Sequence, residues 1–262
     1  MTDSALRSLF DLRGQVALVT GAAGGLGQAI ACAFASHGAD LVLSDRDADA
    51  MAPVAARCRD AGVRAAAICA DLADARQVEE LGAQAVSAFG RIDAMVCNAG
   101  MQGPAGPLLA VDHADWTRVL QVNLASAHAL CAAVVPQMAE RGAGSVTLMA
   151  SIAAMRGNGA IGLYGMSKAA LAQMARNLAV EWGPRGVRAN AIAPGLIRTP
   201  LANDLLANDA FMTRRLAMTP LRRVGEPQEV AGVAVMLAAA AGAFITGQTL
   251  VVDGGTVVSD GS

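Results

Sequence analysis

The sequence has few aromatic residues and no block of one charge. Its 262 residues include two tryptophans, five phenylalanines and one tyrosine. The 20 basic and 22 acidic side chains give a formal net charge of −2 at pH 7, without a cluster of lysines or arginines. Nucleic-acid binding needs a basic surface, so this composition argues against a nucleic-acid partner.

A leader sequence and long apolar segments are also lacking. Residues 1–7 contain no extended apolar core or cleavage pattern, so we expect no secretory signal. The most hydrophobic region, residues 230–245, is shorter than the roughly 20 residues that cross a bilayer. We expect it to form a buried or subunit-interface helix, and we expect no membrane association.

Cysteine and histidine are too few and too scattered for a metal site. The cysteines at positions 32, 58, 69, 97 and 131 form no C-x-x-C pair, and the three histidines share no helical spacing. Reduced thiols are typical of a cytoplasmic protein, which is the location we expect. No metal site is predicted.

Strand-like and helix-like segments alternate along the chain, with no linker or repeat between them. Several of the strand-like segments are continuously apolar, as strands covered on both faces must be. We therefore predict an α/β protein with one domain over residues 1–262, of which 1–13 form an N-terminal extension. The expected architecture is a doubly wound Rossmann fold, a seven-stranded parallel sheet flanked by helices on both faces. The predicted strands lie near residues 15–20, 40–44, 64–70, 92–97, 144–150, 187–192 and 248–252.

A glycine-rich turn joins the first predicted strand to a helix. Gly21, Gly25 and Gly27 follow the apolar run 16–19 and precede a helix-like segment. Glycines let the backbone approach a pyrophosphate, and the start of the following helix attracts its charge. The spacing departs from G-x-G-x-x-G, but the flanking strand and helix favour a dinucleotide site.

Asp45 ends the second apolar run, eighteen residues beyond Gly27. A dinucleotide-binding fold places there the acidic residue that binds the adenosine ribose. A carboxylate repels a 2′-phosphate, so we expect NAD as the cofactor. Arg46 keeps NADP open, because a guanidinium accommodates that phosphate. Asp47 is a candidate N-cap of the next helix.

Tyr164 and Lys168 lie four residues apart, on one face of a predicted helix. An ammonium beside a phenol lowers the phenol pKa from its usual value near 10, which makes the phenol a usable acid or base. Ser151 ends the apolar run 145–150 and is placed to hydrogen-bond the substrate oxygen.

Together with Asn98-Ala99-Gly100, Asn123 and Pro194-Gly195, these features resemble the classical short-chain dehydrogenase/reductase family over essentially the whole chain. The resemblance implies that Tyr164 is the catalytic acid/base. It implies that Lys168 lowers the phenol pKa and holds the nicotinamide ribose, and that Ser151 orients the substrate. Asn123 corresponds to an asparagine that holds a water molecule between the lysine and solvent, although a locally satisfied helix asparagine is the alternative.

The resemblance also implies a set of cofactor contacts. Asp71 corresponds to an aspartate that contacts adenine, with an N-cap as the alternative interpretation. The turn 194–199 corresponds to a clamp on the nicotinamide carboxamide, acting through the Ile197 backbone and the Thr199 hydroxyl. The expected cofactor-binding residues are Gly21, Gly25, Leu26, Gly27, Asp45, Arg46, Asp71, Leu72, Asn98, Ala99, Gly100, Tyr164, Lys168, Pro194, Gly195, Ile197 and Thr199.

The predicted activity is reversible hydride transfer between NAD(H) and a secondary alcohol or ketone. An NADPH-dependent carbonyl or 3-oxoacyl reductase is the alternative enzyme, and a non-catalytic dinucleotide sensor is the alternative outside enzymes. A serine hydrolase does not fit, because Ser151 lacks the G-x-S-x-G turn.

Residues 197–220 are expected to form a helical lid over a pocket for a small-molecule substrate. Candidate pocket residues are apolar (Ala153, Met155, Gly157, Leu163, Met212, Leu216) and polar (Arg156, Asn158, Arg214, Arg215). The resemblance further implies a homotetramer built by helices near 110–141 and 163–182 and by the C-terminal strand.

Overall fold

A single parallel sheet of seven strands organises the computed structural model, which describes residues 8–259. The strand order is β3-β2-β1-β4-β5-β6-β7, so the chain reverses its direction of winding between β1 and β4. The doubly wound fold predicted from the sequence is confirmed, and its ligand crevice is expected at the carboxyl ends of the strands around this switch point. The strands are β1 (Val16–Thr20), β2 (Asp40–Asp45), β3 (Ala65–Cys69), β4 (Ala94–Cys97), β5 (Gly144–Met149), β6 (Val187–Pro194) and β7 (Thr249–Val252).

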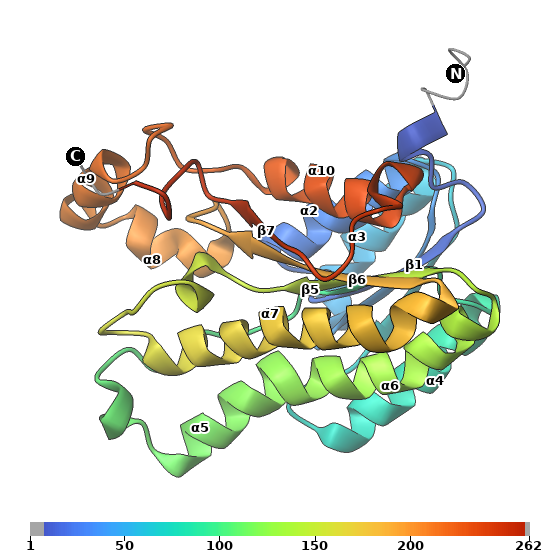
Figure 1. The fold of residues 1–262 in the computed structure, drawn as a ribbon, viewed down its shortest axis with the longest axis horizontal. Coiled ribbons are helices and arrows are strands. Elements are labelled where there is room, and N and C mark those ends of the chain that lie inside the picture. Colours follow the sequence, from blue (N-terminus) through green and yellow to red (C-terminus); the bar gives the residue numbers. More distant parts are fainter. Residues whose placement is uncertain (1–7, 260–262) are drawn as a thin grey trace.

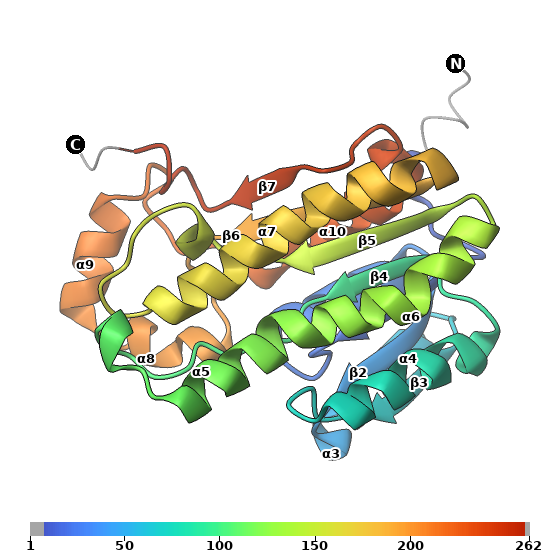
Figure 2. The ribbon, with the colours of Figure 1, turned by 60° about the horizontal axis from the view of Figure 1, so that its bottom comes forward.

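Helices cover both faces of the sheet (Figure 1). One face carries α2 (Gly25–Ser36), α3 (Ala48–Asp60) and α10 (Pro227–Ala238). The other carries α4 (Ala75–Phe89), α6 (Ser126–Glu140) and α7 (Gly162–Trp182), which lie across the strands in Figure 2. The chain also forms short 3-10 helices at Ser8–Phe10 (η1), Leu108–Ala110 (η2), Ile152–Ala154 (η4), Gly183–Arg185 (η5), Pro200–Ala202 (η6) and Ala240–Gly242 (η7).

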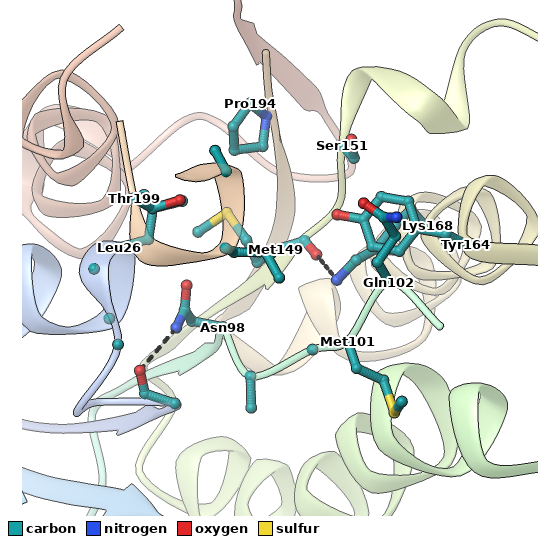
Figure 3. A pocket seen from close by; sticks show the side chains of 18 of the residues that line it. Leu26, Asn98, Met101, Gln102, Met149, Ser151, Tyr164, Lys168, Pro194 and Thr199 are labelled. Atoms are coloured by element: carbon teal, nitrogen blue, oxygen red, sulfur yellow. Dashed lines mark hydrogen bonds between the residues drawn. The ribbon is translucent and has the colours of Figure 1, made fainter. Parts of the chain in front are cut away.

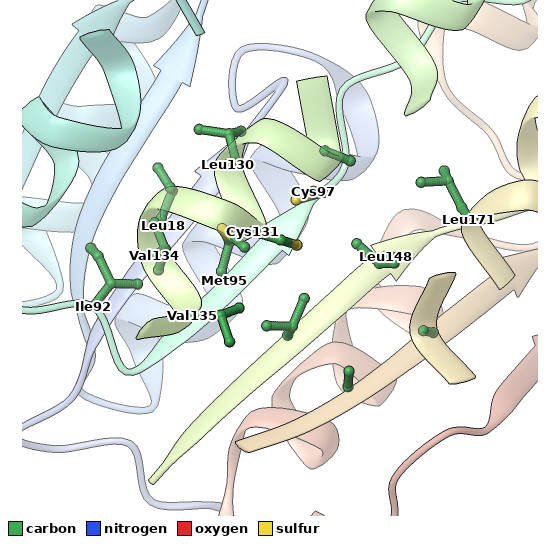
Figure 4. Packing of buried hydrophobic residues seen from close by; sticks show 14 of the residues in the cluster. Leu18, Ile92, Met95, Cys97, Leu130, Cys131, Val134, Val135, Leu148 and Leu171 are labelled. Atoms are coloured by element: carbon green, nitrogen blue, oxygen red, sulfur yellow. The ribbon is translucent and has the colours of Figure 1, made fainter. Parts of the chain in front are cut away.

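Each face of the sheet has its own apolar cluster, because successive side chains of a strand point to opposite faces. In β1, Leu18 faces α4 and α6 while Val19 faces α2 and α10. Figure 4 shows the first cluster, in which Leu130 and Val134 of α6 lie over Met95 of β4. These buried layers fix the strands whose ends carry the site.

One helical stretch, His113–Glu140, is long and apolar enough to cross a membrane by length and composition alone. It comprises α5 (His113–Leu120), the π-helical turn η3 (Gln121–Ala125) and α6. A helix buried in a protein core satisfies the same test, and the inner face of α6 packs on the sheet. The sequence interpretation had instead taken residues 230–245 as the most hydrophobic region. That region forms most of α10 and η7, and α10 packs against α2 within the chain.

Several ends of the predicted elements differ in the structure. The sixth strand continues to Pro194 rather than ending near residue 192. The fourth strand begins at Ala94 rather than near residue 92, because the Asp93 carboxylate takes the hydrogen bond from the Val16 N–H at 2.9 Å. The same carboxylate forms ion pairs with Arg91 and Arg141. Residues 1–7 of the expected N-terminal extension lie outside the described residues. Within the rest, Leu12 is fully buried and its N–H donates to the His37 carbonyl at 2.9 Å.

The segment expected to form a lid is helical. It contains η6, α8 (Asn203–Leu206) and α9 (Asp209–Ala217), and α9 is capped by Asn208, which accepts from the Phe211 N–H at 2.9 Å. These helices lie beyond the carboxyl ends of the strands at one end of the molecule (Figure 1).

Candidate active site

A cavity of about 650 Å³ opens at the carboxyl edge of the sheet. The ends of β1, β2, β4, β5 and β6 all contribute to its wall, as the switch-point rule predicts. Every cofactor-binding residue predicted from the sequence lines it, and so does Ser151. Asn123 is the one predicted site residue that does not.

The glycine turn at the end of β1 has the close backbone approach that a pyrophosphate requires. Gly21 has φ +65°, which favours glycine, and a Cβ on Gly27 would lie 2.0 Å from the Gly21 carbonyl oxygen. The N-cap residue of α2, Gly24, offers no side-chain cap. The first N–H groups of α2 therefore remain available to an anion, so the loop fits the phosphates of a dinucleotide.

Asp45 lies beside this turn, at the end of β2. Its Oδ2 accepts from the Ala23 N–H at 3.1 Å and its Oδ1 accepts from the Arg46 N–H at 2.8 Å. Asp47 caps α3, as predicted, by accepting from the Ala50 N–H at 2.9 Å. The Asp45 carboxylate and the Arg46 side chain thus share one end of the cavity, where both could meet an adenosine ribose.

Asp71 and Asn98 shape the cavity next to the glycine turn. The N-cap of α4 is Asp74, which removes the N-cap interpretation of Asp71; the Asp71 carboxylate instead accepts from the Ala73 N–H at 2.9 Å. The Asn98 amide donates to the carbonyl oxygens of Thr20 and Gly21, and the Asn98 contact is visible in Figure 3. It ties the end of β4 to the glycine turn.

Ser151, Tyr164 and Lys168 meet at the other end of the cavity (Figure 3). Tyr164 and Lys168 lie one turn apart on α7, and the Lys168 ammonium is 5.5 Å from the centre of the phenol ring. Ser151 precedes η4, and its hydroxyl accepts from the Ala153 N–H at 3.1 Å. The three side chains predicted to carry the chemistry are therefore adjacent.

The pKa of Tyr164 shifts in the direction opposite to the sequence-based expectation. Burial raises the pKa of Tyr164 above its ordinary value, and the Ser151 hydroxyl acts in the opposite direction. The expected lowering by Lys168 is not found. The Lys168 ammonium donates to the Met149 carbonyl at 2.8 Å, and burial lowers the pKa of Lys168 to about 8.

Asn123 sits in the π-helical turn η3, 1% exposed. Its Oδ1 accepts from the Met101 N–H at 2.8 Å, and its Nδ2 donates to the Met101 carbonyl and to the Ser167 hydroxyl, each at 2.9 Å. Ser167 in turn donates to the Tyr164 carbonyl at 2.8 Å. The Asn123 side chain thus joins the loop after β4 to the helix that carries Tyr164, and the water-holding role implied by the family remains a prediction.

The turn after β6 closes the cavity between its two ends. Ile197 pairs with Gly225 in an isolated bridge, and the Thr199 hydroxyl donates to the Ile197 carbonyl at 3.4 Å. A Cβ on Gly25 would lie 2.9 Å from the Thr199 side chain, so this turn lies directly against the glycine turn. That position suits a clamp on the nicotinamide end of a dinucleotide.

Some of the expected substrate-pocket residues line the cavity and others do not. Those that line it are Ala153, Arg156, Asn158 and Arg215. Those outside its lining are Met155, Gly157, Leu163, Met212, Leu216 and Arg214. Leu201 and Leu205 of the predicted lid also line the cavity, whereas sequence reasoning missed Met101, Gln102, Arg118, Val122, Met149 and Ile161. Met101 and Gln102 could have been predicted, since they directly follow Asn98-Ala99-Gly100. No sequence pattern indicates the role of the Met149 carbonyl.

Within residues 8–259, no group of three or more His, Cys, Asp or Glu side chains is placed to hold a metal ion.

Comparison with known proteins places the chain in a family. Residues 21–257 match the family described as enoyl-(acyl carrier protein) reductase. The chain belongs to the short-chain dehydrogenase/reductase family of oxidoreductases, which bind a nicotinamide dinucleotide.

Three relatives illustrate the range within that family. An uncharacterized oxidoreductase of Mycobacterium tuberculosis is 43% identical over 248 residues, 94% of each chain. A 7α-hydroxysteroid dehydrogenase solved with NADH and 7-oxo glycochenodeoxycholic acid is 35% identical, with a TM-score of 0.91 over 97% of this chain and 98% of that chain. A gluconate 5-dehydrogenase of Burkholderia cenocepacia, solved with NADP and tartrate, is 34% identical, with a TM-score of 0.91 over 96% and 98%.

Proposed function

We propose that this protein is an NAD-dependent dehydrogenase that reversibly oxidises a secondary alcohol to a ketone. The observation that carries the proposal is the convergence of Ser151, Tyr164 and Lys168 in the cavity whose other end holds the glycine turn and Asp45. A protein that only sensed a dinucleotide would need the turn but not the proton-transfer group. Family membership adds that relatives of this fold are dehydrogenases and reductases.

Tyr164 moves the proton in the proposed reaction. In reduction, its neutral phenol donates the proton to the substrate carbonyl oxygen, and the raised pKa favours this acid form. In oxidation, its phenolate accepts the proton of the substrate hydroxyl while the carbinol C–H bond breaks and its hydride leaves. The nicotinamide, when bound, supplies the acceptor or donor of that hydride. Ser151 orients the substrate oxygen by a hydrogen bond.

Lys168 is proposed to control the phenol after a change of hydrogen-bond partner. Its ammonium must leave the Met149 carbonyl and approach the Tyr164 oxygen before it favours the phenolate. Because Lys168 is buried beside the cavity, a nicotinamide ribose bound there would offer new hydroxyl partners to the ammonium.

The cofactor preference rests on Asp45. Its carboxylate lies beside the glycine turn, where it would accept from ribose hydroxyls and repel a 2′-phosphate. Arg46 favours the second candidate function, an NADPH-dependent carbonyl or 3-oxoacyl reductase, because its side chain also lines this end of the cavity. Relatives of both cofactor types exist, one solved with NADH and another with NADP.

Tyr164→Phe tests the proposed chemistry. We expect turnover of a panel of secondary alcohols with NAD to fall at least about 100-fold, because the variant has no proton to exchange. NAD affinity, measured by calorimetry, should stay within a few fold. Met166→Leu, an exposed change on the same helix, is the control and should retain activity. Near-normal turnover in Tyr164→Phe would remove this residue from the mechanism.

A further inference from the structure

Two arginines line the substrate end of the cavity without an ion-pair partner among the described residues. Arg156 follows η4, five residues after Ser151, and Arg215 lies on α9; both line the cavity. Among residues 8–259, neither guanidinium forms an ion pair, whereas Arg91, Arg141 and Arg223 each do. The Arg215 guanidinium lies only over the Phe211 ring, 5.3 Å from its centre.

Arg156 and Arg215 line the same cavity, and the positive charge of Arg156 acts on the Arg215 guanidinium. Burial lowers the pKa of Arg215, and the positive charges of Arg156 and Arg214 lower it further. Asp253 is the nearby opposite charge, but its carboxylate oxygens accept from the N–H groups of Gly255 and Val257. Partly buried like charges are costly unless an anion lies between them.

The position of the pair relative to the reacting atoms is fixed by packing. A Cβ on Gly165 would lie 2.8 Å from the Ala153 carbonyl oxygen, so η4 rests directly on the first turn of α7. Arg156, two residues after η4, lines the cavity that Ser151 and Tyr164 also line. Apolar side chains of Ile161, Leu201 and Leu205 line the same cavity.

We propose that Arg156 and Arg215 form a subsite for an oxyanion, a carboxylate or a phosphate, carried by the alcohol or ketone substrate. Guanidinium groups bind both anions through paired hydrogen bonds, and two of them neutralise the charge of either. The proposal rests on the proposed function, because it assigns one end of the same substrate. It makes the substrate an anionic secondary alcohol rather than a neutral one.

Matched pairs of probes that differ in charge test the subsite. We would measure the binding of gluconate against gluconamide, 3-hydroxybutyrate against its amide, and glycerol 3-phosphate against glycerol, by calorimetry with saturating NADH. At least one anion should bind about tenfold or more tightly than its neutral partner, and the acid and phosphate arms identify which anion is preferred. Equal binding of anion and neutral partner in all three pairs would overturn the subsite.

Charge-removing variants locate the effect. Arg156→Gln and Arg215→Gln should each lower the affinity for the preferred anion about tenfold or more and leave its neutral partner and NADH within a few fold. Arg214→Gln is the matched control, since Arg214 is exposed on the same helix and lies outside the cavity lining. An equal loss in Arg214→Gln, or no loss in the other two, would contradict the assignment.

The readouts separate this proposal from the proposed function. Charge-dependent binding that persists in Tyr164→Phe, with no turnover of any probe by the unaltered protein, would support the subsite and count against the dehydrogenase. Turnover of neutral alcohols without a preference for anions would support the dehydrogenase and count against the anion subsite.

Discussion

At the scale of single residues, the ionisation of Tyr164 can be measured directly, because it is the only tyrosine in the chain. Its ionisation can therefore be followed by near-ultraviolet absorbance without assignment. Burial raises its pKa, so we expect the phenol of the cofactor-free protein to ionise above pH 10. Since the folded state then holds a proton that the unfolded state releases, the free energy of unfolding should fall as pH rises beyond 10.

The same titration tests the role of Lys168. In the cofactor-free protein the Lys168 nitrogen lies at the Met149 carbonyl, and its pKa of about 8 leaves it uncharged where Tyr164 ionises, so Lys168→Met should change the pKa of Tyr164 little. With NAD bound, we expect the pKa to fall in the unaltered protein and to stay high in Lys168→Met. A pKa below 10 in the cofactor-free protein would mean that the lysine already acts on the phenol.

Asp45 governs the choice of cofactor in the proposed function. Asp45→Ser removes the repulsion of a 2′-phosphate and leaves Arg46 free to pair with it. We expect the NADP/NAD ratio of kcat/KM to rise about 100-fold, since like-charge contacts cost several kcal/mol and about 1.4 kcal/mol is tenfold. Asp47→Ser, which removes the neighbouring charge at the exposed cap of α3, should leave the ratio within a few fold. A starting protein that already prefers NADP would refute the proposed role of Asp45.

At the scale of elements, the site depends on a buried junction of three segments. Asn123 of η3 holds Met101 of the loop after β4 and Ser167 of α7. Asn123→Ala would leave the Met101 N–H and carbonyl without this partner, at about 1–3 kcal/mol for each. The Ser167 hydroxyl keeps its bond to the Tyr164 carbonyl. We expect the free energy of unfolding to fall by about 2–4 kcal/mol and kcat to fall with it.

A second buried polar residue of the same helix provides the control. The Ser126 hydroxyl donates to the Val122 carbonyl within its own helix, so Ser126→Ala disturbs no other segment. It should cost about 1 kcal/mol or less and leave kcat unchanged. Equal effects of the two substitutions, measured by denaturant unfolding and turnover, would show that the junction has no special role.

The strands and the cofactor end of the site were predictable because they follow from local patterns. Apolar runs ended by Gly21, Asp45 or Asn98 mark strands whose carboxyl ends meet at one edge, and the structure brings these residues together. The orientation of Lys168 was not predictable, since its partner is the backbone carbonyl of Met149, which any residue would supply. The start of β4 was missed for a similar reason, because the Asp93 carboxylate accepts from the Val16 N–H, a partner that local sequence patterns do not reveal.

The substrate end was harder to predict because it depends on how separate elements pack. Helical spacing alone gives no reason to separate Arg215, which lines the cavity, from Arg214, which does not. The proximity of Arg156 to Arg215 arises only when η4 rests on α7 and α9 closes the end of the sheet. The sequence predicted three arginines near the substrate, and in the structure two of them, Arg156 and Arg215, line the cavity.

At the scale of the whole molecule, apolar side chains remain exposed at the β7 edge of the sheet. Val180 near the end of α7 is 79% exposed, and Phe244 in the turn before β7 is fully exposed. A Cβ on Gly247 would lie 3.4 Å from the Ala179 side chain, so this turn rests against the end of α7. An exposed apolar surface of this kind suits a contact between subunits.

We expect this surface to contribute to a homotetramer, which sedimentation velocity would detect at the mass of four chains. Val180→Arg and Phe244→Arg each place a charge where we expect an apolar contact, so each should shift the protein to smaller assemblies at the same concentration. Ala52→Arg adds the same charge to an exposed position of α3, near the opposite edge of the sheet, and should leave the assembly unchanged. Unfolding by denaturant checks that each variant is folded before its mass is compared. A protein that sediments as one chain, or that keeps its assembly in both Val180→Arg and Phe244→Arg, would show that this apolar surface serves another purpose.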